Sequence, residues 1–168
     1  FRDRGLEGTT VVAVNISAGS NARSWDMEKY RGLIRRIGQG RHDLRFLVLA
    51  KPDDAERCAA VTAGIPTATS CSSFTFDHFA AAIAKASVLI TPDTAAVHLA
   101  AAARVPAVVL YVQSDPELRI WDPYRSPSEA VVTSSPTLAD VSVEDVLEAF
   151  ERLSRRVDFG PASRTGMP

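Results

Sequence analysis

The chain has 168 residues, of which 46% are hydrophobic, a formal net charge of −1 and an isoelectric point near 6.3. This length fits one domain with a sizeable core, and the near-neutral charge gives no electrostatic reason to expect nucleic acid as a partner. The two cysteines, Cys58 and Cys71, have neither CxxC spacing nor a histidine at zinc-finger distance. We therefore expect reduced thiols, no structural zinc and a cytoplasmic protein.

The two ends of the sequence carry further expectations. No apolar run reaches the length of a membrane span, and the basic start at residues 1–4 is not followed by a signal-peptide core. Because the chain begins with Phe1 and not with methionine, we expect a segment of a longer protein. Residues 157–168, at the end of the sequence, are expected to form a disordered tail.

The first half of the chain alternates apolar runs with helical patterns. Residues 9–16 and 44–50 are near-continuous apolar runs, typical of strands buried on both faces of a parallel sheet. Between them we expect a helix capped by Asp26 and closed by Gly38 and Gly40. The next predicted elements are a helix near 55–63, a weak strand within 67–73 and a helix near 76–85.

The second half continues the alternation. A strand at 88–90 ends in a tight turn, and an alanine-rich helix follows at once. We expect a strand at 107–112, a long loop at 113–128, a short strand at 130–133 and a closing helix at 143–156 capped by Ser142. This order predicts an α/β domain with a Rossmann-like, doubly wound parallel sheet in the strand order 3-2-1-4-5.

That order places two loops at one crevice, because ligands of such sheets bind where the strand order reverses. At the start of the alanine-rich helix, Asp93 or Thr94 caps the helix, and the remaining N–H groups attract anions. His98 lies one turn further along the same face. The loop after the first strand brings Arg23, whose guanidinium suits a pyrophosphate. Alternatively, Asp93 is only a cap, Arg23 a solvated surface charge and Gly19 an ordinary turn residue.

Several stretches carry a resemblance to a known family. They are N-I-S-A-G-S at 15–20, R-S-W at 23–25, T-P-D-T-A-A-V-H-L-A-A-A at 91–102, V-P at 105–106, L-Y at 110–111 and W-D-P-Y at 121–124. In this order and spacing the chain resembles the C-terminal half of glycosyltransferase family 9, the heptosyltransferases of lipopolysaccharide core synthesis. The resemblance implies one half of a GT-B fold: residues 1–156 as a nucleotide-sugar donor-binding domain, with the acceptor and the catalytic base in an N-terminal domain absent from this chain.

The resemblance also implies roles for individual residues. Arg23 corresponds to the basic residue set against the donor pyrophosphate, and Asp93 to the aspartate that touches the sugar. These two are the expected catalytic residues, for leaving-group stabilisation and sugar positioning. The further donor-binding residues are Ser17, Gly19, Asp77 on the ribose, Thr94, Ala95 and His98. For Asp77 a helix cap is the alternative, and Trp25 is expected to pack in the core.

Two residues depart from the family pattern. Ala95 and Val112 stand where the family usually has glycine, which permits close approach to a phosphate or a positive φ. Ala95 is harmless if it lies in the first helical turn. Val112 is β-branched and puts the usual loop conformation in question.

The implied function is inverting, metal-independent transfer of a heptose-like sugar from a nucleoside diphosphate, ADP as expected, to a lipopolysaccharide-type acceptor. The donor is a substrate, so no cofactor and no metal are expected, and the adjacent pair Asp53 and Asp54 is interpreted as a helix start. The chain alone should bind donor and transfer nothing, and the complete enzyme should contact the inner membrane peripherally. Two alternatives remain: a nucleotide-binding module without transferase activity, for which Ala95 and Val112 are the evidence, and a GT-B-like sugar-nucleotide epimerase.

Overall fold

Strands and helices alternate along the chain in a computed structural model that describes residues 6, 8–72, 75–113 and 123–160. The strands are β1 (Thr10–Asn15), β2 (Leu44–Leu49), β3 (Ala68–Cys71), β4 (Val88–Pro92), β5 (Ala107–Val112) and β6 (Ser128–Thr133). The α-helices are α1 (Met27–Gly38), α2 (Ala55–Thr62), α3 (Phe76–Ala84), α4 (Ala95–Ala102) and α5 (Val143–Arg156). Each of these elements overlaps the range that the hydrophobic pattern predicts for it.

The strands form one parallel sheet in the order β3-β2-β1-β4-β5-β6. The order predicted for the first five strands is confirmed, and β6 adds to it as an edge strand two residues longer than expected. The order reverses between β1 and β4, which pair directly, with Val12 opposite Val88 and Val14 opposite Ile90. The carboxyl ends of β1 and β4 are therefore neighbours, and the loops that follow them leave the sheet side by side.

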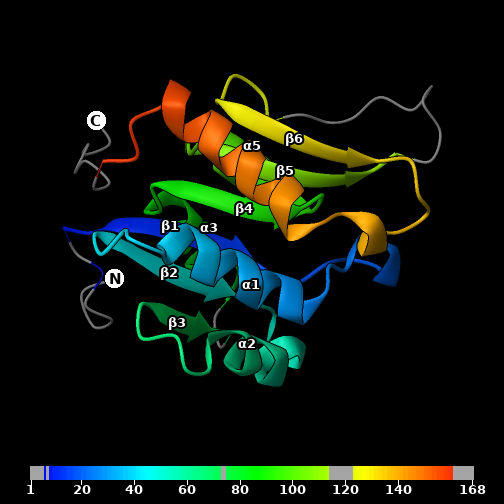
Figure 1. Cartoon of the computed structure of the whole chain (residues 1–168), viewed down its shortest axis with the longest axis horizontal. Coiled ribbons are helices and arrows are strands. Elements are labelled where there is room, and N and C mark those ends of the chain that lie inside the picture. The colour runs from blue at the N-terminus through cyan, green and yellow to red at the C-terminus, as the bar shows by residue number, and fades with distance from the viewer. Residues whose placement is uncertain (1–5, 7, 73–74, 114–122, 161–168) are drawn as a thin grey trace.

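Helices cover both faces of the sheet. Helices α1, α2 and α5 pack on one face of the sheet and α3 on the other (Figure 1). Helix α4 packs on the same face as α3. Alternate residues of β1 point into the two cores: Val12 and Val14 contact the first set of helices, and Val11 and Ala13 contact the second. The predicted doubly wound α/β architecture is confirmed.

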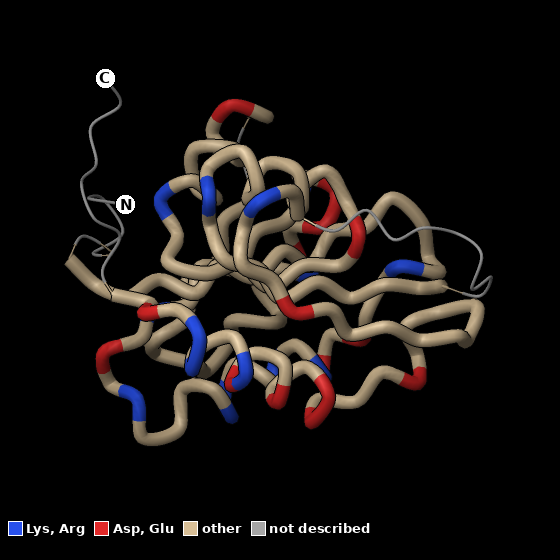
Figure 2. The backbone as a smooth tube through the Cα atoms, turned by 90° about the horizontal axis from the view of Figure 1, so that it is seen from above, with Lys and Arg blue, Asp and Glu red and all other residues tan. Residues whose placement is uncertain are grey.

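The surface carries both signs of charge. Acidic and basic residues are interspersed along the backbone in Figure 2, in keeping with the net charge of −1. None of the helices in the described ranges is long and apolar enough to cross a bilayer.

The closing helix and the residues after it pack on the sheet. Ser142 and Asp145 form a capping box at the start of α5, with each side chain accepting from the other residue's backbone N–H. After the helix, Phe159 is only 7% exposed and lies 5.5 Å from the ring of Phe150, centroid to centroid. Residues 157–160, expected as the start of a disordered tail, thus include a packed aromatic ring, because such a ring gains more by burial than by exposure to water. Residues 161–168 lie outside the described residues, as do Trp121 and Asp122.

The loop after β1 is anchored at its far end by Trp25. This side chain is 1% exposed, and its Nε1–H donates to the carbonyl oxygen of Val141 at 3.0 Å. Its ring meets that of Tyr30 edge to face, with centroids 4.9 Å apart. The prediction that Trp25 packs in the core is confirmed.

The near end of the same loop is tied to the β2–α2 connection. The Ser17 hydroxyl donates to Asp54 Oδ2 at 2.8 Å and accepts from the backbone N–H of Lys51 at 2.9 Å. Arg57 donates to Asp54 Oδ1 at 3.0 Å and to the Ser24 hydroxyl at 3.1 Å. Asp54 is thus more than the start of a helix, because it joins two loops at the carboxyl edge of the sheet.

These contacts set the ionisation of Asp54. Burial alone would raise the pKa of this carboxyl, but the hydrogen bonds from Ser17 and Arg57 and the positive charges of Arg57 and Lys51 outweigh it. The pKa of Asp54 therefore lies below its ordinary value, and the ionised form stabilises the fold.

Phe159→Ala tests whether the segment after α5 belongs to the fold. Removing a buried aromatic ring leaves a cavity and loses apolar burial, so the free energy of unfolding should fall by about 3 kcal/mol. Urea denaturation followed by circular dichroism measures it. Phe76→Ala is the matched control, because Phe76 is 64% exposed and its removal should change stability little. Equal stability of wild type and Phe159→Ala would contradict the packing described above.

Asp54→Asn tests the tie between the two loops. A carboxylate with a lowered pKa stabilises the folded state at neutral pH, and this contribution is lost as the pH falls through the folded-state pKa. Wild type should therefore lose more unfolding free energy than Asp54→Asn between about pH 7 and pH 3. The control is Asp53→Asn, because Asp53 is exposed. Its unfolding free energy should change with pH as that of wild type does. If the unfolding free energy of Asp54→Asn changes with pH as much as that of wild type, the ionised Asp54 carboxylate contributes nothing to stability.

Candidate functional site

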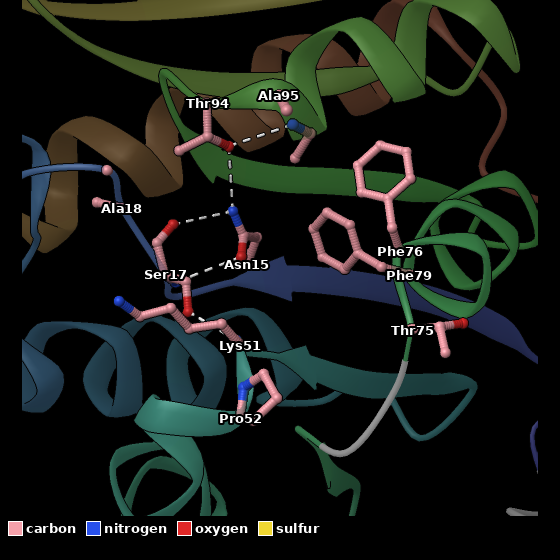
Figure 3. Close-up of a pocket in the computed structure, with 12 residues that line it drawn as sticks. Asn15, Ser17, Ala18, Lys51, Pro52, Thr75, Phe76, Phe79, Thr94 and Ala95 are labelled. Carbon is pink, nitrogen blue, oxygen red and sulfur yellow. Dashed lines mark hydrogen bonds between the residues drawn. The ribbon is translucent and has the colours of Figure 1, made fainter.

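A cavity of about 370 Å³ lies at the carboxyl ends of β1 and β4, where the strand order reverses. Three loops and the starts of two helices enclose it (Figure 3). Its lining consists of Asn15, Ser17, Ala18, Gly19, Lys51, Pro52, Thr75, Phe76, Phe79, Thr94, Ala95 and Ala96. The volume is in the range of small-molecule sites, and the position is the one where open α/β sheets bind ligands.

The N-terminus of α4 forms one wall of the cavity. Of the two residues predicted as candidates, Thr94 is the N-cap of α4. Its hydroxyl accepts from the Ala96 N–H at 3.2 Å. The Val97 N–H donates to the Thr94 carbonyl at 3.0 Å. Among the contacts of the described residues, the Ala95 N–H has no acceptor and remains available to a ligand. A helix N-terminus with an open N–H group favours an anion.

The end of β1 supplies the floor through Asn15, a side chain only 2% exposed. Its Nδ2 carries two hydrogens and has three acceptors in reach, the Thr91 hydroxyl at 3.0 Å, the Ser17 carbonyl at 3.2 Å and the Thr94 hydroxyl at 3.3 Å, so one hydrogen is shared between two of them. Its Oδ1 accepts from the Ser17 N–H at 3.3 Å. One carboxamide thus connects the loop after β1 to the turn before α4.

Two aromatic rings form the opposite wall. Phe76 and Phe79, from the first turn of α3, both project into the cavity (Figure 3). Phe76 is 64% exposed, and the apolar ring of Pro52 also lines the cavity. This side of the cavity suits a flat, uncharged group.

Arg23 and Asp93, predicted from separate loops, lie together. The Arg23 guanidinium is 3.6 Å from the Asp93 carboxylate and donates to the Asp93 carbonyl oxygen at 3.3 Å. Neither residue lines the cavity itself. Asp93 directly precedes Thr94 in the chain, so its pairing with Arg23 brings a cation to the same end of the sheet.

The other expected residues are spread more widely. Ser17, Gly19, Thr94 and Ala95 line the cavity, whereas Asp77 and His98 are exposed and outside its lining. The Ser17 hydroxyl already donates its hydrogen to Asp54. Thr75, whose hydroxyl accepts from the His78 N–H, is the N-cap of α3, so the alternative reading of Asp77 as the helix cap is wrong.

The two departures from the family pattern cause no backbone strain. Among the described residues, the non-glycine positions with positive φ are Arg104 and Arg125. Ala95 is the first residue of α4, and Val112 is the last residue of β5, paired with Thr133. Both therefore have ordinary helical or extended backbone, and the doubt raised by Val112 is removed as far as the strand is concerned.

Sequence reasoning missed Asn15, Lys51, Phe76 and Phe79 as cavity residues. A polar amide at the end of an otherwise apolar strand was the available signal for Asn15. The aromatic residues have helical spacing that is equally typical of core packing, so they could not be placed in a cavity from their spacing.

Carboxylates near the site do not group as metal ligands. Nowhere in the part of the chain that the structure describes do three or more His, Cys, Asp or Glu side chains come together as they would around a metal ion.

Known proteins of similar sequence and structure place this geometry in context. The chain matches glycosyltransferase family 9 (heptosyltransferase) over residues 3–150. No curated protein sequence matches it. A family 9 glycosyltransferase from Veillonella parvula DSM 2008 has a TM-score of 0.78 at 21% identity, over 93% of this chain and 49% of that one.

Two further structures share the fold. E. coli heptosyltransferase WaaC with ADP has a TM-score of 0.73 at 17% identity, over 88% of this chain and 45% of that one. The C-terminal domain of a group 1 glycosyltransferase from Francisella tularensis has a TM-score of 0.58 at 10% identity, over 92% of this chain and 80% of that domain.

The chain spans about half the length of the first two of these proteins. At such identities the likeness shows the fold, which is the Rossmann-like α/β domain found in GT-B glycosyltransferases. Because the family match extends over most of the chain, from residue 3 to residue 150, the chain belongs to glycosyltransferase family 9, the heptosyltransferase family.

Proposed function

We propose that this chain is the donor-binding domain of an inverting, metal-independent glycosyltransferase. Its donor would be a heptose-like sugar on a nucleoside diphosphate, with ADP as the nucleotide, and its acceptor a lipopolysaccharide-type glycolipid in the cytoplasm. The catalytic base and the acceptor site would come from a part of the enzyme other than this domain. The observation that carries the proposal is the cavity at the strand reversal, bounded by the N-terminus of α4.

The cavity has two chemically different sides that fit the two ends of a nucleotide. Phe76, Phe79 and Pro52 present apolar surface suited to a base. Thr94 and the open Ala95 N–H present hydrogen-bond donors suited to a phosphate. The related E. coli heptosyltransferase whose structure contains ADP supports adenine as the base.

The proposed chemistry places negative charge at the phosphate end. When the bond from the anomeric carbon to the donor oxygen breaks, the departing diphosphate gains charge, and pre-placed positive potential stabilises it. The Arg23 guanidinium and the α4 N-terminus supply that potential. Asp93 is then held by Arg23 beside the position of the sugar, where its carboxylate accepts from hydroxyl groups.

The two alternatives have less support. Ala95 and Val112, the evidence for a module without activity, adopt ordinary backbone in this fold. Solved UDP-N-acetylglucosamine 2-epimerases have TM-scores of 0.60, below the 0.73 and 0.78 of the heptosyltransferase-family structures. Titration with ADP, UDP and GDP separates a donor-binding domain from a module that binds none of them.

Gly19→Val tests whether the cavity is the donor site. A Cβ at Gly19 would meet no atom within 4 Å, and its φ is not positive, so the variant should fold with the wild-type melting temperature. Because Gly19 lines the cavity, the added valine side chain should take up space beside it and weaken ligand binding. Titration calorimetry should show affinity for ADP at least about 10-fold weaker than that of wild type, a loss of about 1.4 kcal/mol. Unchanged affinity would mean that ADP binds elsewhere.

Arg23→Ala tests the proposed cation of the site. Losing one charge-assisted contact to phosphate, and leaving Asp93 without its partner, should weaken ADP binding by about 10- to 100-fold. Arg23→Lys keeps the charge and should retain part of the affinity. The exposed Arg35 on α1 gives the control Arg35→Ala, which should bind as wild type does. If Arg23→Ala and Arg35→Ala bind ADP equally well, Arg23 has no part in the site.

A further inference from the structure

Asn15 is oriented without ambiguity. The Ser17 carbonyl can only accept a hydrogen bond, and the Ser17 N–H can only donate one. The first contacts Asn15 Nδ2 at 3.2 Å and the second contacts Asn15 Oδ1 at 3.3 Å. Exchanging the amide nitrogen and oxygen would break both contacts, so the NH2 group faces Thr91 and Thr94.

The hydrogen bonds that Thr94 accepts decide whether its hydroxyl can also accept from a ligand or only donate to it. A hydroxyl oxygen has two lone pairs and one hydrogen. The lone pairs of Thr94 Oγ1 are taken by the Ala96 N–H at 3.2 Å and by Asn15 Nδ2 at 3.3 Å. Only the hydrogen is left, so the Thr94 hydroxyl acts as a donor.

The neighbouring Thr91 competes poorly for that hydrogen. Its own hydroxyl, fully buried, donates to the Pro92 carbonyl at 2.8 Å and accepts from Asn15 at 3.0 Å. The Thr91 and Thr94 oxygens are 3.4 Å apart, longer than a good hydrogen bond between hydroxyl groups. A ligand oxygen in the cavity that Thr94 lines would be the better acceptor.

We propose that Asn15 is a positioning residue for the donor's diphosphate: its carboxamide fills the second lone pair of Thr94 and thereby directs the Thr94 hydroxyl hydrogen to a phosphate oxygen. This inference rests on the proposed function, because it needs a phosphate at the α4 N-terminus. Without the amide, the Thr94 hydroxyl is free to rotate and to accept rather than donate. Asn15 therefore acts on the ligand through Thr94.

A double-mutant cycle tests this coupling in the full 168-residue chain. Thr94→Val removes the hydroxyl and Asn15→Leu removes the amide at similar size. Each single variant should bind ADP about 10-fold more weakly than wild type, the effect of losing one hydrogen bond to a charged group. If Asn15 acts through Thr94, the double variant should bind no more weakly than Thr94→Val alone. Thr94→Ser, which keeps the hydroxyl, should restore most of the affinity.

Two controls separate positioning from simple loss of structure. Thr137 caps the 3₁₀ helix Leu138–Asp140 in the way that Thr94 caps α4, accepting from the Ala139 N–H at 3.3 Å outside the cavity. Thr137→Val should thus lose a cap without changing ADP affinity. Melting curves report whether each variant folds, and Asn15→Ser takes the place of Asn15→Leu if the latter shows no cooperative transition.

The outcomes distinguish this inference from the proposed function. Wild type that binds none of ADP, UDP and GDP would overturn both. A second outcome would overturn the inference alone: wild type binds ADP, but the losses of ADP affinity in Asn15→Leu and Thr94→Val multiply in the double variant. So would wild-type affinity in Asn15→Leu or failure of Thr94→Ser to restore binding.

Discussion

The direct pairing of β1 with β4 is the constraint on which the site depends. Because two parallel strands from distant parts of the chain are neighbours at the reversal of the sheet, their following loops must leave the same edge together. The Asn15 carboxamide at the end of β1 then joins its own loop to Thr91 and Thr94 at the end of β4. This strand order and this amide bring together the loop after β1 and the start of α4, which form two sides of the cavity.

Around that junction, polar groups satisfy one another and leave a few donors for a ligand. Ser17 gives its hydrogen to Asp54, and Asp93 lies against Arg23. Among the contacts of the described residues, the groups left open are the Ala95 N–H and the Thr94 hydroxyl hydrogen, both at the start of α4. A buried polar group without a partner is costly, so such open donors are tolerated only at a surface or where a ligand supplies the acceptor.

Much of the fold could be predicted because its signals are local. The apolar runs of β1, β2 and β5 and the turn before α4 are readable from a few adjacent residues, and the approach of Arg23 to Asp93 followed from the predicted strand order alone. The position of Phe76 in a cavity, the burial of Phe159 and the contacts of Asn15 could not be predicted in this way. Each of these three features depends on which distant residue lies opposite the side chain. The helical or apolar spacing in the sequence is the same whether a side chain faces the protein core or a ligand.

In the proposed complex, a nucleoside diphosphate lies across the carboxyl ends of β1 and β4. Amide chemical shifts of the isotope-labelled chain, followed during titration with ADP, report where it binds. We expect saturable shifts for Gly19, Ala95 and Ala96, with the amides of α5 unmoved, because α5 packs on the opposite face of the sheet from α4. Shifts centred on α5 and β6, or saturation without any change at Gly19 and Ala95, would contradict it.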